Sequence, residues 1–539
     1  MKKRMGKAAA LLMAVTMACG MLAGCGSNGG EKTPETAKTQ TEAGAAESGE
    51  AGEGGGTIVY GSNDYTRINP AMDEHGEINV LIFDGLTDHD GNNEVVPRLA
   101  KSWDYDEENF TYTFHLEEGV KWHDGEPFTA DDVKFTIEAI MDPANESENA
   151  PNYEDVESIT VIDDHTVEFK LSAPNVAFLD YMTMAILPKH LLEGENMQES
   201  DFFRAPVGTG PFKLAKWDEG QQIVLEKNED YFAGPAKIDS VIFKIVSDDN
   251  AKALQLKSGE LNLAQVTPKD AVTFEGDDAY NIYTMSTSDY RGILYNFGNE
   301  YWQENADLIP AINYCIDRQA IIDAVLLGHG QIAYGPLQKN KYNCEDVEKY
   351  DFNLDKAAEA FTAAGCEKDD EGCWRRNGKR IGFTIDATPS DQVRIDMAQI
   401  AAQQLKEAGL DVRAEVPAEG IDWGGQECCI IGWGSPFDAD DHTYKVFGTD
   451  KGANYNGYSN EKVDAYLKAA RETTDENERM AQYALFQKEL AKTPAFTFFC
   501  YIDAMYVGAK NISGIDQNTV LGHHGVGIFW NVCDWTISE

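Results

Sequence analysis

Apolar and polar positions alternate in several short stretches of the chain, as they do in half-buried β-strands. The clearest are Thr111–Leu116, Thr166–Leu171 and Gln222–Lys227, each bounded by turn-forming residues. A further β-like run at residues 57–60 opens the part of the chain that can build a core. These stretches predict strands joined by tight connections.

Elsewhere the apolar positions recur every three or four residues, which is typical of amphipathic helices. Four helices are predicted on this basis, at residues 130–140, 310–327, 395–408 and 476–491. Asp391 stands where a carboxylate favours a helix start, and Gly409 where a glycine favours a helix end. Because strands and helices interleave along the chain, the predicted fold class is α/β.

The first 24 residues have the features of a secretory signal peptide. Four basic residues, Lys2, Lys3, Arg4 and Lys7, precede a short apolar run that ends at Leu22. The stretch Leu22-Ala23-Gly24-Cys25 resembles the bacterial lipobox, in which the Cys is diacylated and becomes the new N-terminus. The alternative is an uncleaved membrane anchor, for which the run is short against a span of about 20 residues. We therefore predict lipidation at Cys25.

Residues 26–56 contain no aromatic side chain and no Ile, Leu or Val. A segment of this kind cannot bury enough surface to offset its ordering entropy, so residues 25–56 are predicted to be a lipidated, flexible tether. The expected location is the cell envelope, with the protein held by lipid alone on the outer face of the cytoplasmic membrane.

The charge balance excludes some partners. The chain carries 92 acidic and 45 basic residues, a net charge of −47, and the predicted signal peptide would remove only basic ones. Such a surface repels nucleic acid and anionic lipid head groups, and it attracts cationic ligands. We expect a monomer that binds no nucleic acid.

The cysteines do not form a motif that is typical of metal or redox sites. Of the ten Cys, all except Cys19 and Cys25 lie at or after Cys315, and no Cys-x-x-Cys spacing occurs. Cys366 and Cys373 flank a polar loop and would pair across it if oxidised. Buried free thiols are the alternative.

Eight motifs, taken in order, resemble the extracytoplasmic solute-binding proteins of the peptide/nickel class that serve ABC importers. They read LAKSW (99–103), YTFHL (112–116), VKWHDG (120–125), FTADDV (128–133), PVGTGPF (206–212), NEDYF (228–232), LKSGE (256–260) and AINYCIDR (311–318). Taken singly, each motif describes packing or a turn. Together they cover most of the chain after the tether.

This resemblance implies a two-lobe clamshell of the periplasmic-binding-protein type. Lobe I would comprise residues 57–290 and 502–539, with an extra subdomain at about 90–205, and lobe II residues 291–501. The chain would cross between the lobes near residues 290–292 and 500–502. Closure of the lobes would bury the ligand.

The resemblance further implies capture of a short peptide or of a nickel or other metal chelate for delivery to an ABC permease and its ATPase. No catalytic group and no cofactor are required, and nickel would be cargo. A ligand sensor for a membrane partner is an alternative that lobe closure would serve equally. A secreted hydrolase is a further alternative, against which the chain lacks His-Glu-x-x-His and Gly-x-Ser-x-Gly.

One motif bears on the choice of ligand. Peptide-binding relatives place an Asp about three residues after a Trp, where it anchors the peptide ammonium. After Trp433 this place holds Pro436, and the pattern Trp-Gly-Ser-Pro-Phe-Asp looks like that of the nickel-binding branch. Trp433 and Asp438 are therefore candidate ligand-binding residues, with Asp440 or Asp441 as substitutes. A packed Trp and a solvated acidic turn are the alternative.

Four histidines are candidate metal ligands, because neutral imidazole suits nickel, copper and zinc. His523 and His524 lie among glycines, and adjacent His residues are ligands in some nickel-binding relatives. His75 follows the Asn69-Pro70 segment, from which such relatives supply a third His, and His442 lies just past the Trp433 motif. The alternative is that the adjacent rings point apart.

Two charged features remain. Arg291, at the first predicted crossing, would hold a carboxylate of a peptide or chelator, or else form a salt bridge between the lobes. The run Asp369-Asp370-Glu371-Gly372 suggests a calcium loop but lacks the alternating ligands of an EF-hand. We predict a hairpin there.

Overall fold

The computed structural model describes residues 55–72 and 76–538. The predicted signal peptide, Cys25, nearly all of the tether and His75 lie outside the described residues. Among the helices that are described, none combines the length and the apolar character needed to cross a bilayer.

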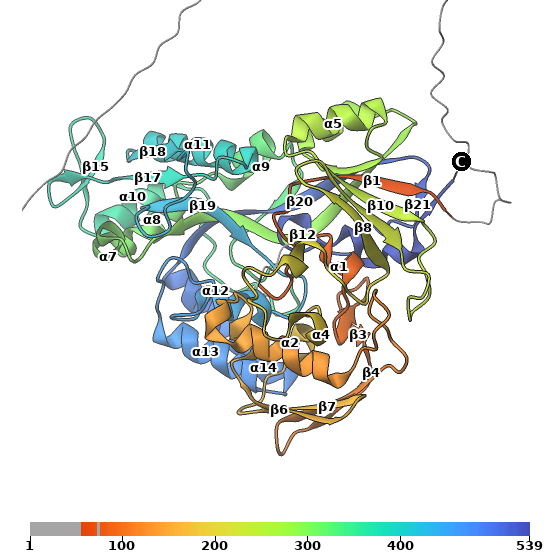
Figure 1. Ribbon diagram of the computed structural model, residues 1–539. Coiled ribbons are helices and arrows are strands. Elements are labelled where there is room, and N and C mark those ends of the chain that lie inside the picture. Colours follow the sequence, from red (N-terminus) through yellow and green to blue (C-terminus); the bar gives the residue numbers. More distant parts are fainter. Residues whose placement is uncertain (1–54, 73–75, 539) are drawn as a thin grey trace, which may run out of the picture. The chain divides into compact units, whose positions relative to one another are not determined.

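An eleven-stranded mixed sheet forms the framework (Figure 1). Its strand order is β18-β17-β19-β12-β20-β11-β1-β10-β9-β8, and β13 pairs with β20 off this path. The strands are β1 (Thr57–Ser62), β8 (Phe212–Asp218), β9 (Gln222–Lys227), β10 (Ser240–Ile245), β11 (Leu263–Val266), β12 (Tyr280–Tyr295), β13 (Gly330–Ile332), β17 (Gly382–Asp386), β18 (Asp411–Glu415), β19 (Cys428–Trp433) and β20 (Phe496–Ala509).

Strands β12 and β20 are the longest, at 16 and 14 residues, and they pair with each other in antiparallel register. One half of this ribbon joins β1 and β8–β11, and the other half joins β17–β19. The predicted crossings lie inside it, where Tyr290 pairs with Tyr501 and Arg291 with Cys500. Register shifts follow Ser286 and Arg291. The division into two lobes stays a prediction.

Within the predicted subdomain, a four-stranded sheet of order β4-β5-β7-β6 packs with helix α2, Ala130–Met141 (Figure 1). The smaller strands are β2 (Thr87–His89), β3 (Val95–Pro97), β4 (Ala100–Asp106), β5 (Thr111–Leu116), β6 (Val156–Asp163), β7 (Thr166–Leu171), β14 (Glu367–Lys368), β15 (Trp374–Arg376), β16 (Lys379–Arg380), β21 (Ile512–Ser513) and β22 (Thr536–Ile537). The predicted strands at β5, β7 and β9 match the observed bounds, and the run at 57–60 lies in β1.

The described α-helices are α1 (Asn79–Ile82), α2 (Ala130–Met141), α3 (Phe178–Tyr181), α4 (Lys189–Leu192), α5 (Asp249–Ser258), α6 (Pro268–Ala271), α7 (Glu300–Asn305), α8 (Ile309–Asn313), α9 (Arg318–Val325), α10 (Leu354–Ala363), α11 (Gln392–Glu407), α12 (Asp440–Phe447), α13 (Glu461–Glu472) and α14 (Glu476–Lys492). Asp391 caps α11, and Gly409 follows it with φ +98°. The predictions at 130–140, 395–408 and 476–491 are therefore confirmed within a few residues.

The helix predicted at 310–327 is wrong in one respect, because the structure divides it into α8 and α9. The Asp317 side chain accepts a hydrogen bond from the backbone N–H of Ala320 at 3.0 Å and caps a new helix. A capping carboxylate competes with helix continuation, and hydrophobic periodicity alone does not report this competition.

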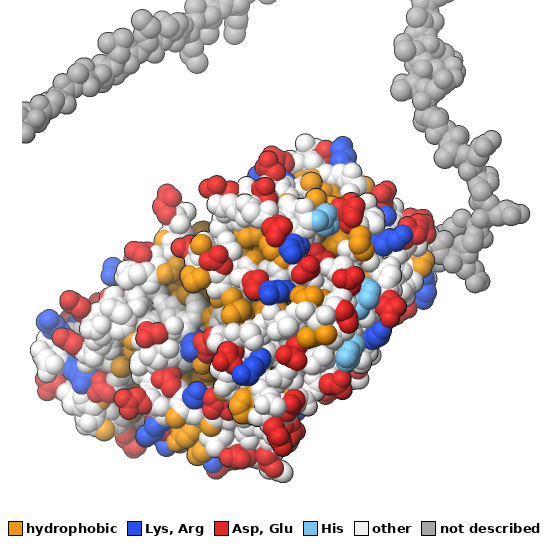
Figure 2. Space-filling view, turned by 60° about the horizontal axis from the view of Figure 1, so that its bottom comes forward, with side chains coloured by type: hydrophobic (Ala, Val, Ile, Leu, Met, Phe, Trp, Pro, Cys, Tyr) orange, Lys and Arg blue, Asp and Glu red, His pale blue; other side chains and the backbone are white. Residues whose placement is uncertain are grey.

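All eight cysteines in the described part of the chain are free thiols, including Cys366 and Cys373. The hairpin predicted around residues 369–372 is confirmed by the pairing of β14 with β15. Figure 2 shows the expected acidic surface, with carboxylates spread across the visible face and fewer basic groups among them.

Candidate functional site

A cavity of about 320 Å³, here called the cleft cavity, opens among segments that are far apart in the sequence. Residues from 70–89, 149–185 and 522–527 belong to predicted lobe I. Residues from 434–442 belong to predicted lobe II. A protein that closes two lobes around a small molecule would hold it in such a place.

The segment from predicted lobe II is set by its close approach to β12. Gly434 follows β19 directly, and a Cβ at this position would lie 1.8 Å from the backbone oxygen of Ser288. Only glycine allows that approach. The chain then turns through Pro436 into α12, so that His442 stands in the first turn of the helix and lines the cleft cavity.

The C-terminal loop places His523 against the same strand. Leu521 exchanges two backbone hydrogen bonds with β12, donating to Ser286 and accepting from Ser288, both at 2.9 Å. His523 follows two residues later, is 8% exposed and lines the cleft cavity. Strand β12 therefore fixes both cavity segments that carry the predicted histidines.

Trp433, the last residue of β19, packs against both imidazoles. Its ring centroid lies 5.5 Å from that of His523, with the planes 22° apart, and 5.8 Å from that of His442. Trp433 is buried and is not among the residues that line the cleft cavity. Its contact with a ligand stays a prediction, while its packing orients the two histidines.

The charged groups of the cavity wall are all acidic. Asp88, Asp180 and Asp441 line it, and no Lys or Arg of the described residues does. Burial raises the pKa values of Asp88 and Asp180. Burial also acts to raise the pKa of Asp441, but attraction by Lys445 and His442 outweighs it and lowers that pKa. A cation in the cavity would stabilise all three carboxylates in their ionised form.

Sequence reasoning missed two members of this wall. His89 Nε2 lies 3.0 Å from Oδ1 of Asp180, and the His89 ring stacks on Phe437 with centroids 3.7 Å apart. The Asp438 N–H also donates to Asp180 Oδ1, at 3.2 Å. His89 and Asp180 are 91 positions apart, so no local spacing in the sequence signals their meeting. These contacts join predicted lobe I to predicted lobe II.

Two of the predicted acidic residues have other partners. The Asp438 carboxylate accepts hydrogen bonds from both Nη atoms of Arg479, each at 2.6 Å. Asp440 is fully buried and accepts from Arg471, at 2.6 Å from Nη2, and from the Tyr181 hydroxyl. A ligand ammonium would have to compete with these guanidinium groups, and neither carboxylate lines the cleft cavity.

Arg291 and His524 also lie away from the cavity wall. Arg291 is buried on β12, and its Nη1 donates to Asp289 Oδ1 at 2.7 Å. The His524 N–H donates to the other oxygen of Asp289 at 2.9 Å, and its ring nitrogen Nδ1 lies 3.4 Å from Arg291 Nη2. Burial first, then the neighbouring His523 and Arg291, lower the pKa of His524 and keep it neutral. Their predicted ligand roles stay predictions.

Among the described residues, the one group of three candidate metal ligands within 4.8 Å of one another is Asp369, Glu371 and Cys373. It lies on the β14–β15 hairpin, and Asp369 already accepts hydrogen bonds from Arg375 at 2.9 Å and Arg380 at 3.1 Å. The cleft histidines thus do not form a preassembled three-ligand site within the described part of the chain.

Comparison with protein families gives a match over much of the described chain. The model of the bacterial extracellular solute-binding proteins, family 5 Middle, matches residues 94–455. Protein XP55 of Streptomyces lividans is 31% identical over 85% of this chain and 86% of its own. The oligopeptide-binding protein AppA of Bacillus subtilis is 28% identical over 98% of this chain and 99% of its own.

Two solved structures extend these matches. NikZ from Campylobacter jejuni, in complex with Ni(L-His), is 35% identical, with a TM-score of 0.84 over 89% of this chain and 99% of its own. AppA from Bacillus subtilis, in complex with a nonapeptide, is 28% identical, with a TM-score of 0.81 over 90% of this chain and 100% of its own. The predicted α/β fold of the periplasmic-binding-protein type is confirmed.

Proposed function

Because the chain belongs to the bacterial extracellular solute-binding proteins of family 5, we propose that its cleft cavity captures a nickel chelate for an ABC importer. The family binds solutes and catalyses no reaction, so the protein is not an enzyme. Peptides and nickel complexes are two of the ligand classes found among its relatives. The ligand of this chain is therefore chosen by the groups on its own cavity wall.

The observation that carries the proposal is the composition of this wall. His89, His442 and His523 line the cleft cavity together with three Asp residues, and no Lys or Arg of the described chain joins them. Imidazole nitrogens suit Ni²⁺, and surrounding carboxylates favour a positively charged complex. The net charge of −47 adds a long-range attraction for the same positively charged complex.

A chelate fits this wall better than a bare ion. The cleft histidines do not form a three-ligand cluster within the described residues, so the protein supplies part of a coordination shell. A small chelator such as histidine would supply the rest. NikZ, the relative at 35% identity, binds nickel in this form, as Ni(L-His).

A short peptide is the second candidate, because AppA binds a nonapeptide. Against it stand Pro436, where relatives carry the ammonium anchor, and the pairing of Asp438 with Arg479. A peptide also carries a C-terminal carboxylate, for which the described wall of the cleft cavity itself offers no cation; Arg98, Lys339 and Lys341 line two adjoining cavities that share Phe437 with it. These features favour the chelate.

The proposed route of delivery follows from the N-terminal sequence. Lipidation at Cys25 would hold the protein at the outer face of the cytoplasmic membrane, and the tether at 25–56 would let it reach the permease. Closure of the two predicted lobes on the chelate would mark the loaded form. Globomycin, which blocks lipoprotein signal cleavage, should leave the unprocessed chain in cells if this route is right.

Isothermal titration calorimetry tests the ligand directly, with three titrants: nickel chloride, nickel with free L-histidine, and a mixture of short peptides. We expect saturable binding of the nickel–histidine complex and weaker binding of nickel alone. Saturable binding of peptides without binding of the nickel complex would contradict the proposal and assign the cavity to peptides.

A further inference from the structure

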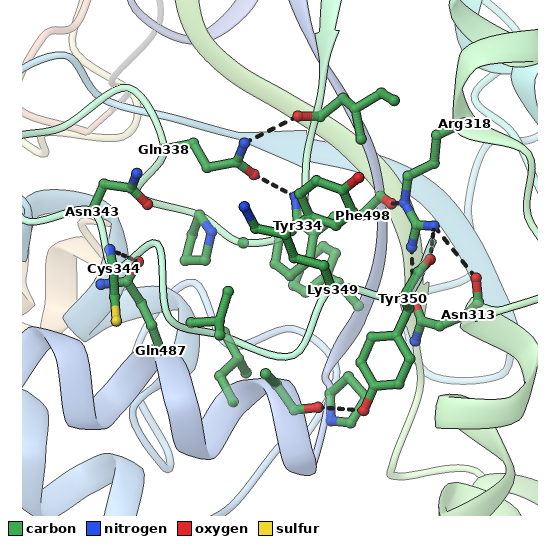
Figure 3. Close-up of a pocket in the computed structure, with 18 of the residues that line it drawn as sticks. Asn313, Arg318, Tyr334, Gln338, Asn343, Cys344, Lys349, Tyr350, Gln487 and Phe498 are labelled. Carbon is green, nitrogen blue, oxygen red and sulfur yellow. Dashed lines mark hydrogen bonds between the residues drawn. The ribbon is translucent and has the colours of Figure 1, made fainter. Parts of the chain in front are cut away.

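A second cavity, of about 440 Å³, lies within predicted lobe II (Figure 3). It is lined by residues from 313–350 and 487–498, and no described residue lines both this cavity and the cleft cavity. We call it the arginine cavity, after Arg318. The proposed function makes no use of it.

Arg318 is the first residue of α9 and is only 4% exposed. Its guanidinium donates to the backbone oxygens of Phe498 at 2.7 Å and Tyr350 at 2.5 Å, and to the side-chain oxygen of Asn313 at 3.1 Å. All its hydrogen-bond partners in the described chain are neutral. Burial lowers the pKa of Arg318 to about 10, because desolvation opposes its charge.

A buried cation is normally paired with an anion. Within the described part of the chain, no carboxylate lies within salt-bridge distance of Arg318, and its Nη2, which carries two N–H groups, makes a single hydrogen bond. One donor at the cavity wall therefore has capacity for a ligand. An anion in contact with it would offset the cost of burying the charge.

A second cation faces the same aromatic ring. The Arg318 guanidinium carbon lies 5.7 Å from the centroid of the Tyr334 ring, and the Lys349 ammonium lies 5.5 Å from it. Glu345, which binds Lys349 at 3.1 Å, is the one acidic residue of this cavity wall among the described residues. The lining is thus net positive in a chain of net charge −47.

Hydrogen bonds hold the polar wall in place. Gln338 donates to the backbone oxygen of Ile332 at 3.0 Å, and Gln487 accepts from the N–H of Cys344 at 3.0 Å. Figure 3 shows these side chains on the side of the cavity away from Arg318. Phe498 and Leu490 contribute apolar surface to the lining. A fixed polar shell with an apolar patch and a cation is typical of small-molecule sites.

We propose that the arginine cavity binds a small organic carboxylate, with one carboxylate oxygen at Nη2 of Arg318 and its apolar body against Phe498 and Leu490. The site would act independently of the cleft cavity. The remaining N–H of Nη2 would donate one charge-assisted hydrogen bond to a carboxylate oxygen, since the other N–H groups of Arg318 already have partners.

Calorimetry with 3-methylbutanoate and its uncharged counterpart 3-methylbutanamide tests this proposal. The carboxylate should bind saturably in the millimolar range, and the amide at least about tenfold more weakly, because it lacks the charge-assisted hydrogen bond. A saturating nickel–histidine complex should leave carboxylate binding unchanged. Equal binding of both probes, or no saturable binding of the carboxylate, would overturn the proposal.

Variants that fill the cavity locate the site without removing Arg318, which also ties α9 to β20. Gly335 lines the cavity, and a Cβ there would meet no atom within 4 Å, so Gly335→Leu should fold. It should weaken carboxylate binding at least about tenfold, as should Val347→Trp. The control is Leu485→Trp, at an exposed position of α14 outside the cavity, which should bind as the wild type does. Unchanged binding in both filling variants would refute the site.

Discussion

The cleft cavity and the arginine cavity differ first in the sign of their charged groups. The cleft cavity has three Asp residues and no Lys or Arg in its described wall, whereas the arginine cavity has Arg318 and Lys349 against one Glu. Both lie in a chain with twice as many acidic as basic residues. The net charge of a protein therefore predicts the long-range attraction of a ligand, and the local wall decides which ligand is held.

The largest change in stability is expected from a substitution outside the cleft cavity, at Asp438. Asp438→Ala leaves the Arg479 guanidinium buried without its carboxylate, which should lower the free energy of unfolding by about 3–5 kcal/mol. Affinity for the nickel–histidine complex should stay within about threefold, because Asp438 does not line that cavity. Urea unfolding and calorimetry measure the two quantities.

Asp346→Ala is the matched control, because its carboxylate pairs with Lys488 at an exposed site and should contribute little to the free energy of unfolding. Loss of nickel affinity in Asp438→Ala at unchanged stability would show that Asp438 binds the ligand. It would contradict the assignment of Asp438 to a structural ion pair outside the cleft cavity.

A second large effect on stability is expected at Glu77, which holds a segment of the cleft cavity wall by a hydrogen bond. Its Oε1 accepts from the N–H of Gly527, a wall residue, at 3.1 Å, and from the Tyr506 hydroxyl at 3.2 Å. Burial raises the pKa of Glu77 from 4.5 to about 7. The fold thus favours the protonated acid. The contribution of protonated Glu77 to stability is fully present below pH 4.5 and is lost as the pH rises through about 7.

Glu77→Gln should therefore gain stability over the wild type as the pH rises from 5 to 8, by up to about 3 kcal/mol. Urea unfolding of both proteins across this range measures the difference. A difference that stays constant with pH would mean that Glu77 does not titrate there.

The cleft histidines should produce the next effect. The double variant His442→Ala, His523→Ala should lose about 100-fold in affinity for the nickel–histidine complex, because two of the three imidazoles at the wall are removed. His115→Ala is the control, since His115 is bonded to Asp104 on the four-stranded sheet, away from the cavity wall. Calorimetry that finds full nickel affinity in the double variant would exclude both histidines as ligands.

The smallest effect is expected at Lys349. Its ammonium is partly exposed and already bound to Glu345, so Lys349→Ala should weaken 3-methylbutanoate binding by only about threefold. Lys349→Arg should retain wild-type affinity. If Lys349→Ala lost as much affinity for 3-methylbutanoate as Gly335→Leu, the carboxylate would be assigned to Lys349 and not to Arg318.

The sequence predicted regular elements well where one local signal dominated. Strict alternation placed β5 and β7 at their observed bounds. The helix predicted at 310–327 was divided because the Asp317 cap outweighed a continuous apolar pattern. That competition depends on one side-chain hydrogen bond, which periodicity does not measure.

The cleft cavity was only half predictable. His442 and His523 stood out because of their residue type and their neighbouring motifs, and both line it. His89 and Asp180 gave no signal, because they meet only through the packing of distant segments. The ion pair of Asp438 with Arg479 could not be predicted from the sequence either, since Arg479 lies 41 positions away on α14.

Anomalous X-ray scattering at the nickel edge, from crystals grown with nickel and L-histidine, shows whether the cleft cavity binds the nickel chelate. We expect one strong peak in the cleft cavity, about 2.1 Å from an imidazole nitrogen of His442 or His523. A cleft cavity without nickel, and a peak at the Asp369–Cys373 hairpin or at a surface histidine instead, would contradict the account.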